Sequence, residues 1–161
     1  MPFKIRTEVY QVNLPEIDLE SVIICLEQKK IFVTDILDVT KQIEVQSRQE
    51  DMEIDKLIEQ RQIRIQRIKK CDELIKEKLK LLDNTQKENW ERIIKGEEYY
   101  PKNGDEKKAF ELAFEIKQLF IRTAKIDRRA KENLQKQFDE AKENLTDLRK
   151  NKASNSNMFN V

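Results

Sequence analysis

Apolar residues recur at alternating steps of three and four along residues 54–82, and this spacing is what most limits the folds open to the chain. The members of the series are Ile54, Ile58, Ile65, Ile68, Ile75, Leu79 and Leu82. Such steps place every member on one face of an α-helix, which gives the helix a single apolar seam. The two positions that would complete the series hold charged residues, Arg61 and Asp72. The spacing therefore predicts a long helix that packs along one side and must accommodate two charges there.

Two further stretches, over residues 19–47 and 110–148, show the same spacing. The chain has only two Gly and three Pro, with no proline between Pro15 and Pro101, while 39% of its residues are charged. Few helix breakers and dense charge are typical of long amphipathic helices. We therefore expect an all-α fold, in which an antiparallel helical hairpin and a long third helix form an elongated coiled-coil bundle of three to four helices.

A length of 161 residues predicts a single helical domain over residues 1–161. Its expected parts are an N-terminal arm (1–14), a first helix (15–48), a second helix (52–82), a short helix or an extension of the second (85–96), a third helix (106–150) and a flexible tail (151–161). Pro15 or Asp18 would start the first helix and Asp51 would cap the second, while TQKE at 85–88 has the pattern of a capping box.

The two charges in the seam of residues 54–82 are interpreted as locks on the register of the hairpin. An antiparallel pairing that matches the two apolar series sets Lys29 opposite Asp72 and Thr40 opposite Arg61. A shift by one heptad would leave Lys29 and Asp72 against apolar residues. An unpaired charge at a half-buried seam is strongly destabilising, whereas a paired charge costs much less. Lys29, Asp72, Thr40 and Arg61 are therefore the predicted register lock.

The same register predicts that Cys25 and Cys71 remain free thiols. Cys71 would lie about five residues from the level of Cys25, which is roughly 7–8 Å along the helix axis. Cysteines joined by a disulfide need Cα atoms within about 7 Å of each other.

The residue types do not point to catalysis. The chain has no histidine, which removes the commonest general base and the commonest transition-metal ligand. It also has neither a GxxxxGK[ST] nor a GxGxxG phosphate-binding loop. We therefore expect no enzymatic activity, no cofactor and no metal site.

Nucleic acid and membranes are also unexpected partners. The net charge is only +1, and the basic residues between 61 and 80 are not interleaved with aromatic ones, so this basic face is interpreted as a solvated surface. The longest apolar run, Val22–Leu26, is far too short to span a membrane. No secretory signal is evident, and two cysteines make no disulfide framework, which favours the cytoplasm.

The predicted third helix changes character along its length. Its first half has two apolar stripes, and the second of them offers an alternative binding groove formed by Leu112, Ile116, Leu119 and Ile126. Its second half has only one stripe, which we name the C-terminal stripe and which comprises Leu134, Phe138, Ala141, Leu145 and Leu148. Because the third helix is longer than the first, the hairpin cannot cover it throughout. The C-terminal stripe is therefore the preferred candidate for contact with a partner helix.

Three segments within residues 26–74 form a helix, an acidic turn and a second helix: DILDVTKQ (35–42), ED (50–51) and LIEQRQIRIQRI (57–68). This region resembles the N-terminal hairpin of the FlgN family of flagellar export chaperones, with the FliT chaperones as near relatives. Residues 133–160 are similar to the closing helix of that family and its short basic tail, which contains asparagines.

The resemblance implies a cytoplasmic type III (flagellar) export chaperone, which binds the aggregation-prone terminal helices of hook-associated or filament-cap proteins in an apolar groove and delivers them to the export machinery. The implied partners are amphipathic helices of these flagellar axial proteins, together with components of the export gate or ATPase. A homodimer is left open. In that family the C-terminal helix takes part in client binding, which here implies the C-terminal stripe. The competing interpretation is a structural coiled-coil stalk or scaffold protein without a client.

Overall fold

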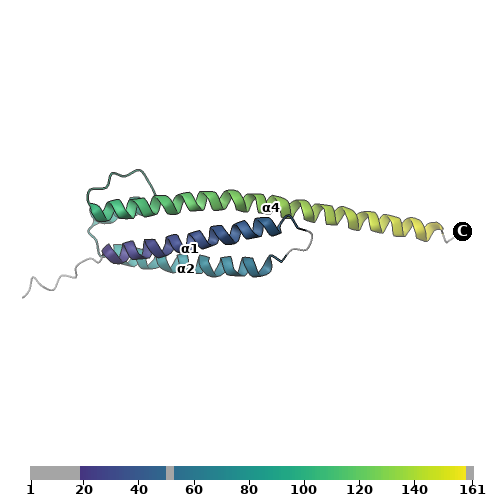
Figure 1. The fold of residues 1–161 in the computed structure, drawn as a ribbon, viewed down its shortest axis with the longest axis horizontal. Coiled ribbons are helices and arrows are strands. Elements are labelled where there is room, and N and C mark those ends of the chain that lie inside the picture. The colour runs from purple at the N-terminus through teal and green to yellow at the C-terminus, as the bar shows by residue number, and fades with distance from the viewer. Residues whose placement is uncertain (1–18, 50–52, 159–161) are drawn as a thin grey trace, which may run out of the picture. The chain divides into compact units, whose positions relative to one another are not determined.

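A computed structural model describes residues 19–49 and 53–158, and it describes side-chain surroundings up to Asn155. Over these residues the chain forms four helices and no strand, which confirms the all-α prediction (Figure 1). The helices are α1 (Leu19–Gln46), α2 (Asp55–Leu79), α3 (Asn84–Ile94) and α4 (Gly104–Met158). The expected arm at 1–14, the helix starts at Pro15 or Asp18 and the cap at Asp51 lie outside the described residues.

The described residues divide into two compact units. Unit 1 contains residues 19–30 and 69–115, and unit 2 contains the described residues of 31–68 and 116–158. The helices α1, α2 and α4 contribute residues to both units, whereas α3 belongs to unit 1. Since long helices are shared in this way, the units are not consecutive segments of chain, and the single domain expected from the length stays a prediction.

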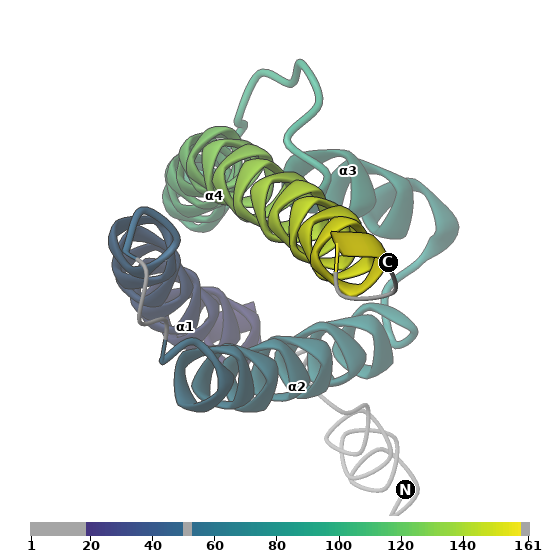
Figure 2. The ribbon, with the colours of Figure 1, turned by 90° about the vertical axis from the view of Figure 1, so that its right-hand side faces the viewer.

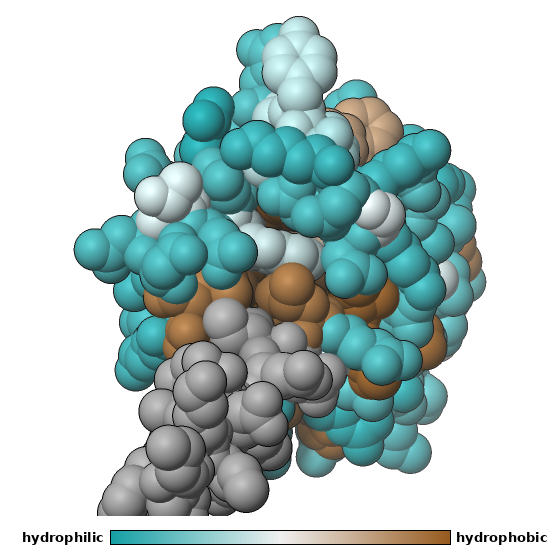
Figure 3. All heavy atoms as spheres, turned by 90° about the vertical axis from the view of Figure 1, so that its left-hand side faces the viewer, coloured by the Kyte–Doolittle hydropathy of each residue, from teal (hydrophilic) through white to brown (hydrophobic). Residues whose placement is uncertain are grey.

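The core of unit 1 is formed by one face each of α1, α2 and α3 together with small residues of α4. Its most deeply buried side chains include Val22, Leu26, Ile75, Trp90, Ile93 and Ala109. Figure 3 shows one face of the molecule, on which a group of apolar residues is visible among mostly hydrophilic ones. The helical spacing of three and four thus places most seam residues of α1 and α2 inside, as the sequence predicted. The exception in the seam of α2 is Ile58, which is 45% exposed.

The core of unit 2 brings together α1, α2 and α4, which surround a common interior in the view of Figure 2. Buried residues from α1, from the position just before α2 and from α4 form one cluster, with Leu57 and Leu134 packed against it: Val39, Ile43, Ile54 and Ala130. In the same unit the guanidinium of Arg67 lies 5.6 Å from the centre of the Phe32 ring, a cation–π contact between α1 and α2.

The segment after α2 forms a separate helix rather than an extension of α2. Asp83 has extended backbone angles (φ −64°, ψ 164°), and its Oδ1 accepts a hydrogen bond of 2.8 Å from the N–H of Gln86. Asp83 is therefore the N-cap, and the capping box expected at 85–88 is wrong. Aspartate is among the best N-cap residues, and it precedes Thr85 in the chain, so the helix begins earlier than the box predicts.

The end of α3 is a glycine-dependent turn. Gly96 has φ 69°, in the left-handed region, and its N–H donates to the carbonyl of Ile93. The N–H of Glu97 donates to the carbonyl of Arg92 at 3.1 Å, which completes the Schellman pair of bonds. This turn ends α3, and the loop that leads to α4 follows it.

The loop before α4 is fastened to the buried carboxylate of Glu106. Tyr99 donates its hydroxyl proton to Glu106 Oε1 at 2.6 Å, and the N–H of Lys102 donates to Glu106 Oε2 at 2.8 Å. Burial raises the pKa of Tyr99 to about 12, and the hydrogen bond to Glu106 acts in the same direction. Asn103 caps α4, because its Oδ1 accepts from the N–H of Glu106 at 2.9 Å.

The helix α4 is longer at both ends than the expected 106–150. It begins at Gly104 and continues to Met158, so the expectation of a flexible tail is wrong for residues 151–158. The reason is local, because no Gly or Pro follows Gly104 and nothing in the sequence terminates the helix. The other helices are slightly shorter than expected, since α1 ends at Gln46 and α2 ends at Leu79.

Candidate functional site

Most of the C-terminal stripe is exposed on α4 in unit 2. Phe138 is 64% exposed, Leu145 is 56% exposed and Leu148 is 64% exposed, while Ala141 is also exposed. Leu134 differs, because it is half-buried and packs against the cluster of Val39, Ile43, Ile54 and Ala130. The predicted residues therefore lie on one helix face, but only the four that follow Leu134 are available to a partner.

Polar bonds mark the place where α4 leaves the α1–α2 hairpin in unit 2. Gln137 Nε2 donates to the carbonyl oxygen of Ser47 at 2.6 Å and to that of Gln49 at 3.2 Å. Asn133, one turn earlier, donates through Nδ2 to Ser47 Oγ at 3.1 Å. These carbonyls follow the end of α1, where helix carbonyls lack partners within the helix. The C-terminal stripe continues past this point, as Figure 1 shows for α4.

Sequence reasoning missed the role of Asn133 and Gln137. The two amides are four residues apart and so share one face of the helix, which was a usable signal. Their meaning depends on knowing that the end of α1 lies opposite, and the spacing within α4 does not contain that information.

Phe138 and Leu145 lie outside the core of unit 2, although Leu134 of the same stripe packs against it. One and two heptads before Phe138 the same face holds Lys131 and Ala124, and both are exposed. The buried positions of α4 in this unit follow another face, through Thr123 and Ala130. That buried face becomes polar at Gln137 and Asn144, so it ends where the hairpin ends. The exposed stripe is therefore not simply a continuation of the core.

The alternative groove is part of the packed interior. Ile116 is only 5% exposed, and Leu112, Leu119 and Ile126 are half-buried. These residues share a stripe without charges, whereas the other apolar stripe of this half contains Lys117, which is exposed. The buried positions of this half of α4 come from both stripes, since Ala113 is buried along with Ile116 and Thr123, while the charge of Lys117 stays at the surface. These four positions favour the other interpretation of this half of the helix, which is bundle core, and binding at an alternative groove here stays a prediction.

The first half of the register lock is present in unit 1. Lys29 Nζ lies 2.7 Å from Asp72 Oδ1, so α1 and α2 pair at this level as predicted. Cys25 and Cys71 are buried and free, which confirms the prediction of two thiols. Burial raises the pKa of both thiols above the usual value, which keeps them protonated and less reactive.

The second half of the lock takes a different form in unit 2. Arg61 Nη1 donates to Asp127 Oδ1 of α4 at 2.8 Å, and Lys131 Nζ lies 3.0 Å from Asp127 Oδ2. Thr40 is buried, and its Oγ1 has no hydrogen-bond partner within the described residues. Arg61 therefore bonds to α4 rather than to Thr40, because a carboxylate offers a stronger, charge-assisted bond than a hydroxyl does. That Thr40 and Arg61 lie at one level of the hairpin stays a prediction.

The carboxylate of Asp127 is stabilised by both cations. Burial alone would raise the pKa of Asp127, but the hydrogen bonds from Lys131 and Arg61 and their positive charges outweigh burial and lower the pKa below its usual value. Asp127 is thus held ionised, and it links α2 to α4 within unit 2.

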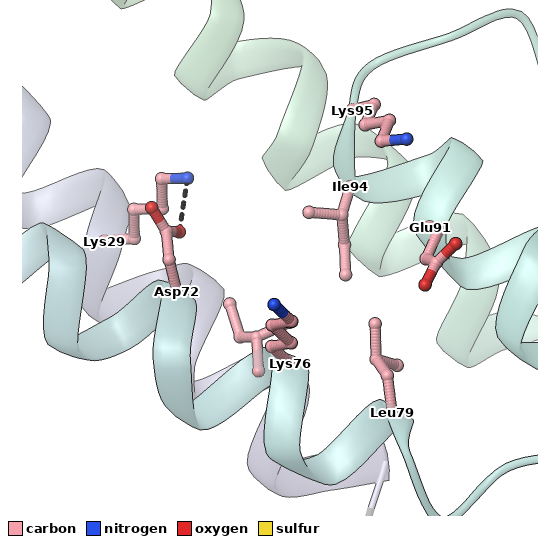
Figure 4. A pocket seen from close by; sticks show the side chains of 8 residues that line it. Lys29, Asp72, Lys76, Leu79, Glu91, Ile94 and Lys95 are labelled. Carbon is pink, nitrogen blue, oxygen red and sulfur yellow. Dashed lines mark hydrogen bonds and ion pairs between the residues drawn. The ribbon is translucent and has the colours of Figure 1, made fainter.

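A pocket that the sequence did not predict lies in unit 1 beside the Lys29–Asp72 pair. Its volume is about 560 Å³, and it is lined by Lys29, Asp72, Ile75, Lys76, Leu79, Glu91, Ile94 and Lys95. Figure 4 shows that Ile94 of α3 and Leu79 of α2 face the space, with the charged groups around it. The pocket exists because α3 is a separate helix packed beside α2, so finding it required recognition of the cap at Asp83.

The described residues contain no cluster of three or more His, Cys, Asp or Glu side chains placed to hold a metal ion. None of the described helices combines the length and the apolar character that a membrane crossing requires. No family model, curated protein or solved structure matches the chain.

Proposed function

We propose that this protein is a cytoplasmic export chaperone of the FlgN type, which holds an aggregation-prone terminal helix of a hook-associated or filament-cap protein on the C-terminal stripe of α4. The observation that carries the proposal is the exposure of Phe138, Leu145 and Leu148 on a helix segment that extends past the hairpin of unit 2. The resemblance of residues 26–74 and 133–160 to that family supports the same function.

The geometry of the stripe suits a single amphipathic helix. Its members alternate at steps of three and four, which is the spacing of a two-helix coiled-coil seam. A partner helix can lay its own apolar face along such a seam, as in other helix-in-groove complexes. Burying a large apolar side chain there contributes about 1.5–3 kcal/mol, so two or three such residues provide useful affinity without a deep cleft.

The sequence has no nucleotide-binding loop. This is consistent with a chaperone that holds its client without ATP, rather than one that uses ATP to remodel the client. In the proposed cycle the chaperone keeps the client helix from polymerising early and delivers the client to the export gate or ATPase. Release then requires only that the export machinery compete for the same client helix.

One observation favours a second function. The helix α4 is 55 residues long, and a long helix with a single apolar stripe is also what a coiled-coil stalk or scaffold protein without a client would have. In a stalk the exposed stripe would be covered permanently by another copy or by a fixed structural partner. In a chaperone it would be free at rest and covered only by the client.

Binding experiments with purified proteins distinguish the two functions. Hook-associated and filament-cap proteins, with terminal helices intact or deleted, would be mixed with the full chain and separated by size-exclusion chromatography with light scattering. The proposal expects a defined complex with an intact client and none after deletion of its terminal helices. A stable homo-oligomer that binds none of the intact clients would instead support the structural function.

A further inference from the structure

The residues that flank the C-terminal stripe carry charge of one sign. In heptad notation Phe138 and Leu145 occupy a positions, and Leu134, Ala141 and Leu148 occupy d positions. The e and g positions border the contact surface of a helix pair and select partners. The e positions hold Gln135, Lys142 and Arg149, and the g positions hold Gln137, Asn144 and Asn151. The border of the stripe therefore has two cations and no acid.

The acids of this segment lie on the opposite face of the helix. They are Asp139, Glu140, Glu143 and Asp147, at the b, c and f positions. Lys142 and Arg149 are exposed, and neither forms an ion pair with another described residue. Their charges are thus available to a helix that covers the stripe.

We propose that the C-terminal stripe selects an amphipathic helix with acidic flanks, in which Asp or Glu borders the apolar seam opposite Lys142 and Arg149. This inference rests on the proposed function, since it specifies the chemistry of the helix held at the same site. Opposite charges at the border of a helix pair steer association and fix its register.

A second copy of this chain is a poor occupant of the stripe. In a parallel pair of α4 helices, Gln137 and Asn144 would face Lys142 and Arg149 of the other copy, which provides no charge attraction. In an antiparallel pair the e positions face each other, so the cations would repel. The border therefore disfavours self-association and leaves the stripe open to an acidic partner.

Two synthetic amphipathic peptides of about four heptads test the inference with the full-length chain. They share one Leu-rich seam, with Glu at all flanking positions in the first peptide and Lys in the second. We expect the Glu peptide to bind at least about tenfold more tightly by fluorescence anisotropy in low salt. Raising the salt concentration should reduce the difference in affinity between the Glu and Lys peptides, because exposed charges are screened.

Charge-reversal variants locate the effect on the border. Lys142→Glu combined with Arg149→Glu should reverse the preference between the two peptides. The matched control is Lys136→Glu combined with Lys150→Glu, which makes the same change of charge at f positions away from the seam and should leave the preference unchanged. A control pair that reverses the preference equally would overturn the inference, because net charge alone would then explain it.

The remaining outcomes separate this inference from the proposed function. Equal binding of both peptides that disappears in Phe138→Ala/Leu145→Ala would overturn the acidic-flank inference and leave helix binding at the stripe intact. Binding of neither peptide, together with a homodimer that Leu148→Ser dissociates in sedimentation experiments, would overturn both.

Discussion

Lys29 keeps only 14% of its side chain exposed, and Asp72 supplies its counter-charge at 2.7 Å. Removing Asp72 while keeping Lys29 would leave an ammonium group largely desolvated without a partner. We expect Asp72→Leu to lower the free energy of unfolding by about 1–3 kcal/mol; the cost is moderate because Asp72 is 47% exposed.

A double-mutant cycle tests whether the two charges act on each other. Replacing Lys29 and Asp72 together by Leu should recover much of the loss, since no charge then remains at the seam. Urea unfolding would measure the midpoint and slope for the wild type, both single variants and the double variant. A double variant as unstable as Asp72→Leu would show that the pair does not set the stability of the hairpin.

Asp127 gives stability a pH dependence of predictable sign. Its pKa is lower in the folded protein than in the unfolded chain, so the unfolded chain binds the proton more readily. The stabilisation is therefore fully present above the unfolded-state pKa, near 3.9, and is lost as the pH falls through the lower folded-state value.

The variant Asp127→Asn should remove this contribution, so its deficit in urea stability relative to the wild type should be largest near neutral pH and shrink below about pH 4. The comparison needs both proteins at matched ionic strength. A deficit that stays constant down to pH 3 would contradict the assigned role of the carboxylate.

At this scale the sequence predicts a contact only where no third helix offers a competing partner. Lys29 and Asp72 were found because they face each other within the hairpin. Arg61 was assigned to Thr40 by the same register, but Asp127 of α4 provides a charged acceptor that the hairpin alone does not reveal. A register derived for two helices does not show which side chains a third helix will bring within bonding distance.

The helix α3 depends on its N-cap residue, because Asp83 satisfies a backbone N–H that has no partner inside the helix. We expect Asp83→Ala to lower the free energy of unfolding by about 1 kcal/mol and Asp83→Asn to cost much less, since Asn also caps well. Urea unfolding measures both variants. Equal losses in the two variants would show that charge, rather than the capping hydrogen bond, supports α3.

The periodic helices were the predictable elements, because spacings of three and four are local and each helix carries its own pattern. The packed face of α4 was not predictable from spacing alone, since two stripes satisfied the same rule. The buried positions come from both stripes, since Ile116 of one and Ala113 of the other are buried, while Lys117 remains exposed. A charged residue within a regular apolar stripe, such as Lys117, was therefore the sequence signal for a position that stays at the surface.

The pocket of unit 1 could not be predicted, because it depends on α3 turning back at Asp83 and packing beside α2. The C-terminal stripe, in contrast, could be read directly. Its exposure requires only that α4 extend past Gln137, where the hairpin of unit 2 ends. The apolar series over 110–148 is longer than the series over 19–47, which already indicated that α4 would outrun the hairpin.

For the whole molecule, the proposed function requires that the C-terminal stripe contribute to binding and little to folding. Phe138 and Leu145 are mostly exposed, so truncating them removes little buried area from the folded chain. Phe138→Ala combined with Leu145→Ala should therefore change Tm by only a few degrees in calorimetry.

The same double variant should weaken client binding by roughly 10²–10⁴-fold in Kd, because each side chain contributes on the order of 1.5–3 kcal/mol when a client helix buries it. The matched control is Ile63→Ala with Ile121→Ala, which truncates apolar residues of comparable exposure away from the stripe and should leave Kd unchanged. If the stripe variant instead unfolds readily, and binding falls only in proportion to the folded fraction, the stripe supports the fold and the client binds elsewhere. Measuring Kd and Tm on the same samples separates these outcomes, since one predicts lost affinity in a folded protein and the other predicts lost folding.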